Sequence, residues 1–188
     1  MKDITKLASD LIRKNIHLIG ERKFHELLNC WEYYEGIQDM DTAADIVGRI
    51  SALLLEAKIP FMDYLEFLPS NSLWGVKMTT LTIPKNIHGI GDYAITDSEI
   101  KHIVINGKLN YVGEGAFSYC HSLETVTFRG RVESFYEEVF WESPNVEHIY
   151  YNGSKEEFAN IPGVIYIWNN LPNVTVHCTD GEATRPTK

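Results

Sequence analysis

Two different hydrophobic periods divide the chain, and the first of them is helical. Within residues 1–60, apolar residues recur at intervals of three and four, the spacing that places them on one face of an α-helix. This spacing predicts three helices, whose apolar faces are formed by Ile4, Leu7, Leu11 and Ile16, by Phe24, Leu27, Leu28 and Trp31, and by Ala43, Ile46, Val47, Ile50, Leu53 and Leu54. Pro60 ends the third helix because it cannot continue the helical hydrogen bonds. We expect a three-helix module over residues 1–60 that caps the rest of the chain or docks a partner.

Residues 61–77 (FMDYLEFLPSNSLWGVK) are rich in aromatic residues and lead away from the helical region. We expect this segment to be a junction whose apolar side chains cover the open end of the next domain.

From Leu81 onward, apolar residues alternate in short strands that recur every 22 or 23 residues. The apolar pairs that define these strands are Leu81/Ile83, Ile103/Ile105, Val126/Phe128 and Ile149/Tyr151. One such unit is a strand with a compact return, and it cannot bury its apolar edge alone, so neighbouring units stack and share a core. We therefore expect a solenoid over residues 78–181, with about four repeats and a terminal strand in a curved parallel sheet, followed by a flexible tail at 182–188.

One of these units, LNYVGEGAFSYCHSLETVTF, resembles the BspA-type leucine-rich-repeat family. The match is closest at Val112, Gly113, Ala116, Phe117, Cys120, Leu123 and Val126. The neighbouring units depart from it at Ser98, Tyr136 and Ser143, and the ending YYNGSKEEFANI…NVTVHCTDG also resembles the terminal unit of that family. The resemblance covers roughly Leu81 to Gly181 and implies a protein-binding or adhesion scaffold with no shared catalytic residues. With the helical region added, the predicted fold class is α+β.

The outward side of the predicted sheet is the first candidate binding surface. If the apolar pairs point inward, the alternating residues point outward. They form three rows, namely Thr80, His102, Thr125 and His148; Thr82, Val104, Thr127, Tyr150 and Thr175; and Pro84, Asn106, Arg129, Asn152 and His177. Solenoids bind partners on such faces. We predict a protein-binding site formed by His102, Val104, Thr127, Arg129, His148, Tyr150 and Asn152; the alternative is a solvated sheet of residues that simply favour strands.

The charge of the chain indicates a second candidate surface. With 26 acidic and 17 basic residues, the net charge is −9, which argues against direct binding of nucleic acid or of an anionic membrane. Residues 133–157 include seven acidic residues and one basic residue, Lys155. A patch formed by Glu133, Glu137, Glu138 and Glu142 could attract a basic partner, including a nucleic-acid-binding protein. The alternative is an acidic edge that keeps the protein soluble.

Motifs for catalysis or metal binding are weak. Cys120-His121 and His177-Cys178 each offer at most one ligand to a given site, because adjacent residues on a strand point to opposite sides. Gly113-Glu-Gly115 lacks the third glycine and the Lys-Ser/Thr of a phosphate-binding loop. We expect no catalytic residue, no metal site and no cofactor.

These observations lead to one functional hypothesis and two alternatives. The charged N-terminal segment and the three widely spaced cysteines favour a cytoplasmic protein with reduced thiols. We expect a non-enzymatic scaffold, for which the family resemblance implies a bacterial or phage origin, that binds a host protein and inhibits or redirects it by steric occlusion. One alternative is a surface adhesin with the same repeats. The other is a small-molecule binder or enzyme with a pocket at the helix–solenoid junction, lined by Tyr64, Phe67, Trp74 and His88.

Overall fold

The structure is a computed structural model and describes residues 14, 54–55 and 61–185. Most of the predicted three-helix module lies outside the described residues, so that module stays a prediction. Residues 54–55 are helical, and Leu54 is buried in the same hydrophobic core as the solenoid.

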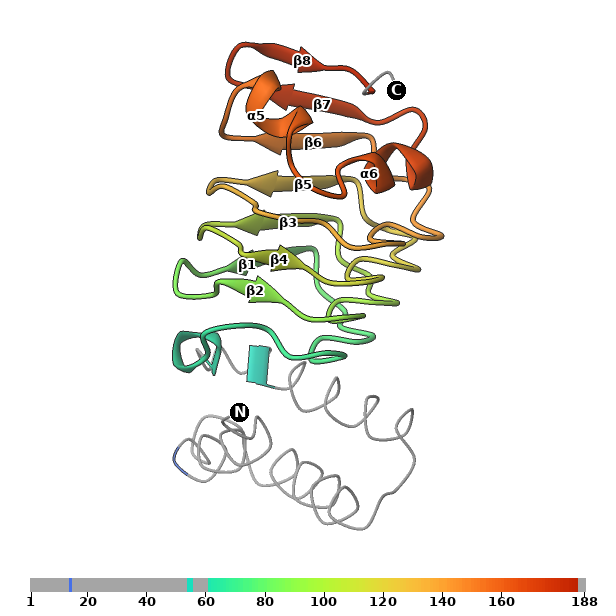
Figure 1. Cartoon of the computed structure of the whole chain (residues 1–188). Coiled ribbons are helices and arrows are strands. Elements are labelled where there is room, and N and C mark those ends of the chain that lie inside the picture. The colour runs from blue at the N-terminus through green and yellow to red at the C-terminus, as the bar shows by residue number, and fades with distance from the viewer. Residues whose placement is uncertain (1–13, 15–53, 56–60, 186–188) are drawn as a thin grey trace.

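The described chain coils into stacked rungs, with a six-stranded sheet along one wall (Figure 1). The strand order is β1 (Thr80–Ile83), β3 (His102–Ile105), β5 (Thr125–Phe128), β6 (His148–Tyr151), β7 (Thr175–Cys178) and β8 (Gly181–Ala183). Strands β1 to β7 of this sheet pair in parallel, and Ile105, Phe128 and Tyr151 lie opposite one another in register. The repeat strands and their stacking are therefore confirmed.

A second wall faces this sheet and is made of much shorter segments. Its strands β2 (Gly89–Ile90) and β4 (Tyr111–Val112) pair in parallel, and single bridges extend the pairing to Leu68 on one side and Phe135 on the other. A chain segment of two residues is too short to show an alternating pattern, which is why the sequence did not reveal this wall.

Residues 61–77 form a coil of the solenoid that lacks a strand in the large sheet. The segment opens with the short 3-10 helix η1 (Phe61–Tyr64). The Leu68 amide then donates to the Gly89 carbonyl at 2.9 Å, and the Leu73 amide donates to the Ala94 carbonyl at 2.7 Å. Later coils repeat the second contact, since the Ile95 amide donates to the Ala116 carbonyl of the next coil at 2.9 Å. The segment thus covers the first full repeat and continues its backbone hydrogen bonds.

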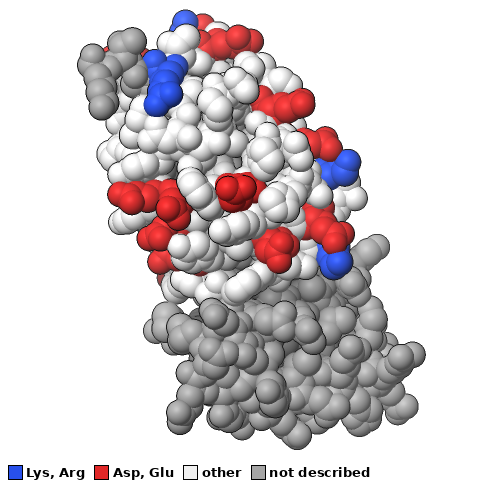
Figure 2. All heavy atoms as spheres, turned by 90° about the vertical axis from the view of Figure 1, so that its right-hand side faces the viewer, with Lys and Arg blue, Asp and Glu red and all other residues white. Residues whose placement is uncertain are grey.

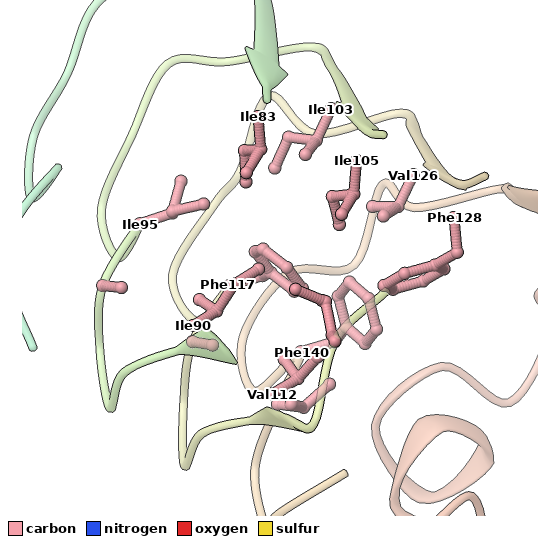
Figure 3. Close-up of a cluster of buried hydrophobic side chains, with 14 of the residues drawn as sticks. Ile83, Ile90, Ile95, Ile103, Ile105, Val112, Phe117, Val126, Phe128 and Phe140 are labelled. Atoms are coloured by element: carbon pink, nitrogen blue, oxygen red, sulfur yellow. The ribbon is translucent and has the colours of Figure 1, made fainter. Parts of the chain in front are cut away.

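The core lies between the two walls and is filled by side chains that repeat from coil to coil. Figure 3 shows Ile83, Ile105 and Phe128 reaching from the sheet toward Ile90 and Val112 on the second wall. Their burial is essentially complete, and each large apolar side chain buried in this way contributes about 1.5–3 kcal/mol. The rings of Phe117 and Phe140 stack with centroids 5.2 Å apart, which links two successive coils.

Each coil turns sharply at two residues in the left-handed backbone region, four positions apart. In chain order the two sets are Asn71, Tyr93, Gly115 and Glu138, and Gly75, Asp97, Tyr119 and Glu142. Most of them are not glycine, so each carries a conformational cost of about 1–2 kcal/mol. Hydrogen bonds between the turns offset it, as between the Tyr93 amide and the Glu114 carbonyl at 2.8 Å. We call the surface formed by residues 91–99, 113–121 and 136–142 the turn edge; it forms the right-hand side of the solenoid in Figure 1.

Two short helices and an antiparallel strand close the C-terminal end (Figure 1). Helix α5 (Lys155–Ala159) begins with a capping box, in which the Glu157 amide donates to Ser154 Oγ at 3.1 Å and the Ser154 amide donates to Glu157 Oε2 at 3.0 Å. Helix α6 (Ile165–Asn170) buries Ile167 and Trp168 against the last coils. No helix in the described part of the chain has the length and apolar character needed to cross a membrane.

The predicted flexible tail begins too early. Glu182 and Ala183 belong to β8 and pair with His177 and Val176 of β7. Gly181 has a φ of 124°, which allows the chain to reverse after Asp180 and run back along β7. Strand β8 is too short to show a hydrophobic repeat, so the prediction that placed Glu182 and Ala183 in the flexible tail is wrong.

Candidate functional site

The outward side of the six-stranded sheet, which we call the sheet face, holds all seven residues predicted to bind a partner. His102, Val104, Thr127 and His148 are half-buried, and Arg129, Tyr150 and Asn152 are exposed. Their inward neighbours are buried, as the alternating pattern required. The register aligns them across β3, β5 and β6, because His102 lies opposite Thr125 and Thr127 lies opposite Tyr150.

Strand β7 lies two residues away from its predicted register. Thr175 lies opposite His148, and His177 lies opposite Tyr150. Thr175 therefore belongs to the first outward row and His177 to the middle row, in contrast to the prediction. Helices α5 and α6 occupy the connection before β7, so the spacing of the earlier repeats could not place this strand.

The corrected register creates a group of three rings on the sheet face, His148, Tyr150 and His177, which we call the aromatic cluster. The rings of Tyr150 and His177 stack with centroids 4.7 Å apart and planes 14° from parallel. His148 Nδ1 lies 3.2 Å from His177 Nε2, within hydrogen-bonding distance. Tyr150 nevertheless remains 41% exposed, so a large part of its ring is open to a partner.

Polar side chains in the rest of the sheet face are held by their neighbours in adjacent coils. Arg129 Nη1 donates to Asn106 Oδ1 at 3.1 Å, and Asn152 Nδ2 donates to the Arg129 carbonyl at 3.1 Å. His102 Nδ1 lies 3.0 Å from Thr125 Oγ1. These contacts orient the side chains before any partner arrives.

At the margin of this face, Lys101 Nζ donates to Glu124 Oε1 at 2.9 Å. That hydrogen bond holds the pKa of the Glu124 carboxyl below its usual value.

The predicted acidic patch is divided between two regions of the molecule. Glu133 pairs with Lys108 beyond the strand ends, away from the turn edge. Glu137, Glu138 and Glu142 lie on the turn edge. Glu137 Oε1 accepts a hydrogen bond from the Tyr166 hydroxyl at 3.2 Å, which raises the pKa of that tyrosine.

Acidic residues from earlier coils join these three glutamates on the turn edge. The segments that form it contain no Lys or Arg and seven acidic residues, Asp92, Asp97, Glu99, Glu114, Glu137, Glu138 and Glu142. Figure 2 shows that acidic side chains predominate on this side of the solenoid. A signal for this grouping is present in the sequence, because Asp92, Glu114 and Glu137 occupy the same position in successive repeats.

Exposed aromatic rings are interspersed with these carboxylates. Tyr119, Tyr136 and Trp141 are 45%, 55% and 44% exposed. The Tyr93 hydroxyl donates to Glu114 Oε1 at 2.8 Å, and this hydrogen bond to a carboxylate raises the pKa of Tyr93 to about 12. The turn edge is thus both negatively charged and aromatic.

A surface cavity of about 280 Å³ lies at the opposite side of the coils from the turn edge. It is lined by Lys108, Arg131, Val132, Glu133, Tyr151, Glu157, Asn160, Ile161 and Pro162. Its charged groups neutralise one another, since Lys108 pairs with Glu133 and Arg131 Nη2 lies 2.5 Å from Glu157 Oε1. Burial raises the pKa of the Tyr151 hydroxyl at its floor, which keeps this group neutral.

The cysteine position of the repeat forms a buried polar ladder through three coils. Ser98 Oγ lies 3.4 Å from Cys120 Sγ, and Ser143 Oγ accepts a hydrogen bond from the Cys120 amide at 2.9 Å. Ser98 and Ser143 therefore occupy the cysteine position, as the alignment of the repeats predicted. Burial raises the pKa of the Cys120 thiol, so it is held as a neutral group in the core. Within the described ranges, no three His, Cys, Asp or Glu side chains gather into a group that could hold a metal ion.

The junction pocket proposed as an alternative site is described only on its solenoid side. Phe67 and Trp74 are half-buried there, and His88 is exposed. The helices that would form its other wall lie outside the described residues, so this pocket stays a prediction.

Comparison with known families agrees with the coil architecture. A family model described as "BspA type Leucine rich repeat region (6 copies)" matches residues 55–161, more than half of the chain. The match begins before the first strand of the large sheet, in agreement with the additional coil at 61–77. Comparison with curated proteins and with solved structures gave no match. The length of the family match and the in-register stacking of the coils show that this chain belongs to the BspA-type leucine-rich-repeat family.

Proposed function

We propose that this chain is a non-enzymatic scaffold that binds a protein partner through its sheet face, with Tyr150 as the central anchor. The observation that carries this proposal is the aromatic cluster, in which Tyr150 is stacked on His177 yet keeps 41% of its surface exposed. Aromatic and Arg side chains supply most of the binding energy at protein interfaces, and Arg129 lies in the adjacent row.

The sheet face is also suited to binding because its side chains are already ordered. Association costs about 0.5–1.5 kcal/mol for each flexible side chain that must be immobilised. The ring stack and the hydrogen bonds of Arg129 and Asn152 lower this cost, because these groups are restrained in the free protein. The fully packed core behind the strands keeps the face rigid.

The turn edge is a second candidate surface, and it favours a partner of opposite charge. Of the seven acidic residues of the turn edge, Glu99 pairs with Lys77 of the preceding coil at 2.7 Å. The other six attract a basic surface and increase its association rate. The exposed rings of Tyr119, Tyr136 and Trp141 can in addition contact Arg side chains through cation–π interactions. A basic protein, such as one that binds nucleic acid, would have this chemistry.

The biological setting we propose is a cytoplasmic one, in a bacterium or during phage infection. There the scaffold would bind a host protein and inhibit or redirect it by covering its functional surface. The repeat family supports partner binding in either setting, and the three widely spaced cysteines favour a reducing compartment. A surface adhesin would use the same sheet face, and measuring export of the chain in its native cell separates these two settings.

Site-specific photo-crosslinking tests which surface binds. A photoreactive residue is placed at Thr127 in the middle of the sheet face, at Glu114 on the turn edge, or at Lys85 as an exposed control site. Each protein is irradiated in native lysate, and the crosslinked partner is then purified and tested for direct binding. We expect crosslinks from Thr127 that Tyr150→Ala abolishes. Crosslinks from Glu114 alone would assign the partner to the turn edge, and equal yield from Lys85 would refute a specific surface.

A further inference from the structure

His148 and His177 come together from strands 29 residues apart and belong to separate coils. They lie on the same outward side of the neighbouring parallel strands β6 and β7. Their nearest ring nitrogens, Nδ1 of His148 and Nε2 of His177, are 3.2 Å apart. This geometry brings two metal-binding atoms to one point of an accessible surface.

We propose that His148 and His177 form a two-histidine site for a divalent transition-metal ion. Imidazole nitrogens bind such ions at about 2.0–2.1 Å, so two nitrogens on one ion lie about 2.9–3.4 Å apart. The observed separation of 3.2 Å falls in that range. Binding requires that the two nitrogens direct their lone pairs to one point.

Both histidine rings can bind a metal ion as neutral tautomers. Each ring must be neutral, with its hydrogen on the nitrogen that faces away from the metal. For His177 that nitrogen is Nδ1, which lies 3.9 Å from Glu182 Oε1. A carboxylate that accepts a hydrogen bond from the outer nitrogen of a ligating histidine supports the metal-binding tautomer, and the exposed Glu182 side chain has to move closer to accept it. The stacked Tyr150 further restrains the His177 ring.

The described residues supply two ligands at this point and no third, so water completes the coordination. An imidazole site that does not impose a geometry follows the general order of divalent affinities, in which Cu²⁺ exceeds Ni²⁺ and Zn²⁺. We therefore expect Cu²⁺ to bind most tightly. Low pH should abolish binding, because protonated histidine cannot ligate a metal.

The test is a calorimetric titration of the full, untagged chain with Cu²⁺, Ni²⁺ and Zn²⁺. We expect loss of one bound Cu²⁺, or weakening of that site by about 100-fold, in His148→Ala and in His177→Ala, because a single imidazole loses the chelate effect. Glu182→Gln should weaken the site by about tenfold. His102→Ala is the matched control, since His102 lies on the same sheet face with Thr125 instead of a second histidine beside it.

A measurement on the wild-type protein makes the result independent of how the variants fold. In nuclear magnetic resonance spectra, substoichiometric Cu²⁺ should broaden the ring signals of His148 and His177 before those of His102. Equal broadening of all histidines, or unchanged Cu²⁺ affinity in a folded His177→Ala variant, would overturn the proposal.

Discussion

Tyr150 and His177 stack in parallel across strands β6 and β7, with ring centroids 4.7 Å apart. The contact joins the last regular repeat to the terminal unit, which reaches the sheet only after helices α5 and α6. It gives the sheet face a rigid aromatic surface close to its C-terminal end. The partner-binding role that we propose for this face depends on that surface.

Replacing Tyr150 and Arg129 together by alanine should abolish partner binding and leave the protein folded. Both side chains are exposed, and loss of an exposed side chain usually changes stability by no more than about 0.5 kcal/mol. Loss of two interface anchors costs at least about 2 kcal/mol of binding free energy each. Thermal unfolding and the dissociation constant of the purified complex measure the two effects.

Thr82→Ala is the matched control for this double variant. Thr82 is exposed in the same middle row but lies on β1, three strands from Tyr150. It should leave the dissociation constant unchanged. A double variant that binds as tightly as the wild type would place the partner elsewhere.

The shared core should make the solenoid sensitive to the loss of one large side chain. Phe117→Ala should lower the free energy of unfolding by about 3–5 kcal/mol, because it leaves a cavity in a fully buried site stacked on Phe140. Tyr136→Ala removes a ring of similar size that is 55% exposed, and it should have little effect. Urea denaturation monitored by circular dichroism measures both. Equal destabilisation of the two variants would contradict the stacked core.

The regular strands could be predicted from the sequence because their burial is one-sided and periodic. Leu81 and Ile83 alternate with exposed residues, and the same pattern recurs one coil later. The coil at 61–77 has no such pair, although Leu68 occupies the position of Ile90. Leu68 and Leu73 are fully buried in the shared core, but without a strand pair before them they are too few to reveal the repeat.

The candidate sites were predictable to the extent that they follow the repeat. The rows through Thr127 and Arg129 follow from alternation alone, whereas His177 was misplaced because two helices precede β7. Glu133 was grouped with Glu137 because they are close in sequence. The coil turns between the strand ends and the turn edge, so residues four apart lie on different sides of the molecule.

The left-handed turn at Glu142 should be relieved by glycine. Glu142 is exposed and has a φ of 52°, a conformation that glycine adopts at little cost. Glu142→Gly should be more stable than Glu142→Ala by about 1 kcal/mol. Both variants remove the same charge, so their difference isolates the backbone conformation. Chemical denaturation of the pair measures it, and an alanine variant at least as stable as the glycine variant would show that the turn carries no strain.

Charge reversal on the turn edge should slow association if the partner is basic. Glu138→Lys combined with Glu142→Lys should lower the association rate and weaken its dependence on salt, because long-range attraction acts before contact. Asp63→Lys with Glu66→Lys makes the same change in net charge at exposed sites in the first coil. Stopped-flow measurement at several salt concentrations compares the two. If both double variants behave alike, the effect is due to net charge and the turn edge has no specific role.

The Tyr93–Glu114 hydrogen bond should give a stability loss at high pH. The pKa of the Tyr93 hydroxyl is about 12 in the folded protein and about 10 in the unfolded chain. The hydrogen bond therefore stabilises the fold fully below pH 10, and this stabilisation is lost as the pH rises to 12. The effect is small because the hydroxyl is near the surface. Ring signals in nuclear magnetic resonance spectra should show Tyr93 titrating near 12, and Glu114→Gln should return its pKa toward 10. Glu137→Gln is the control, because Glu137 binds Tyr166 instead, and a Tyr93 titration unchanged by Glu114→Gln would disprove the assigned cause.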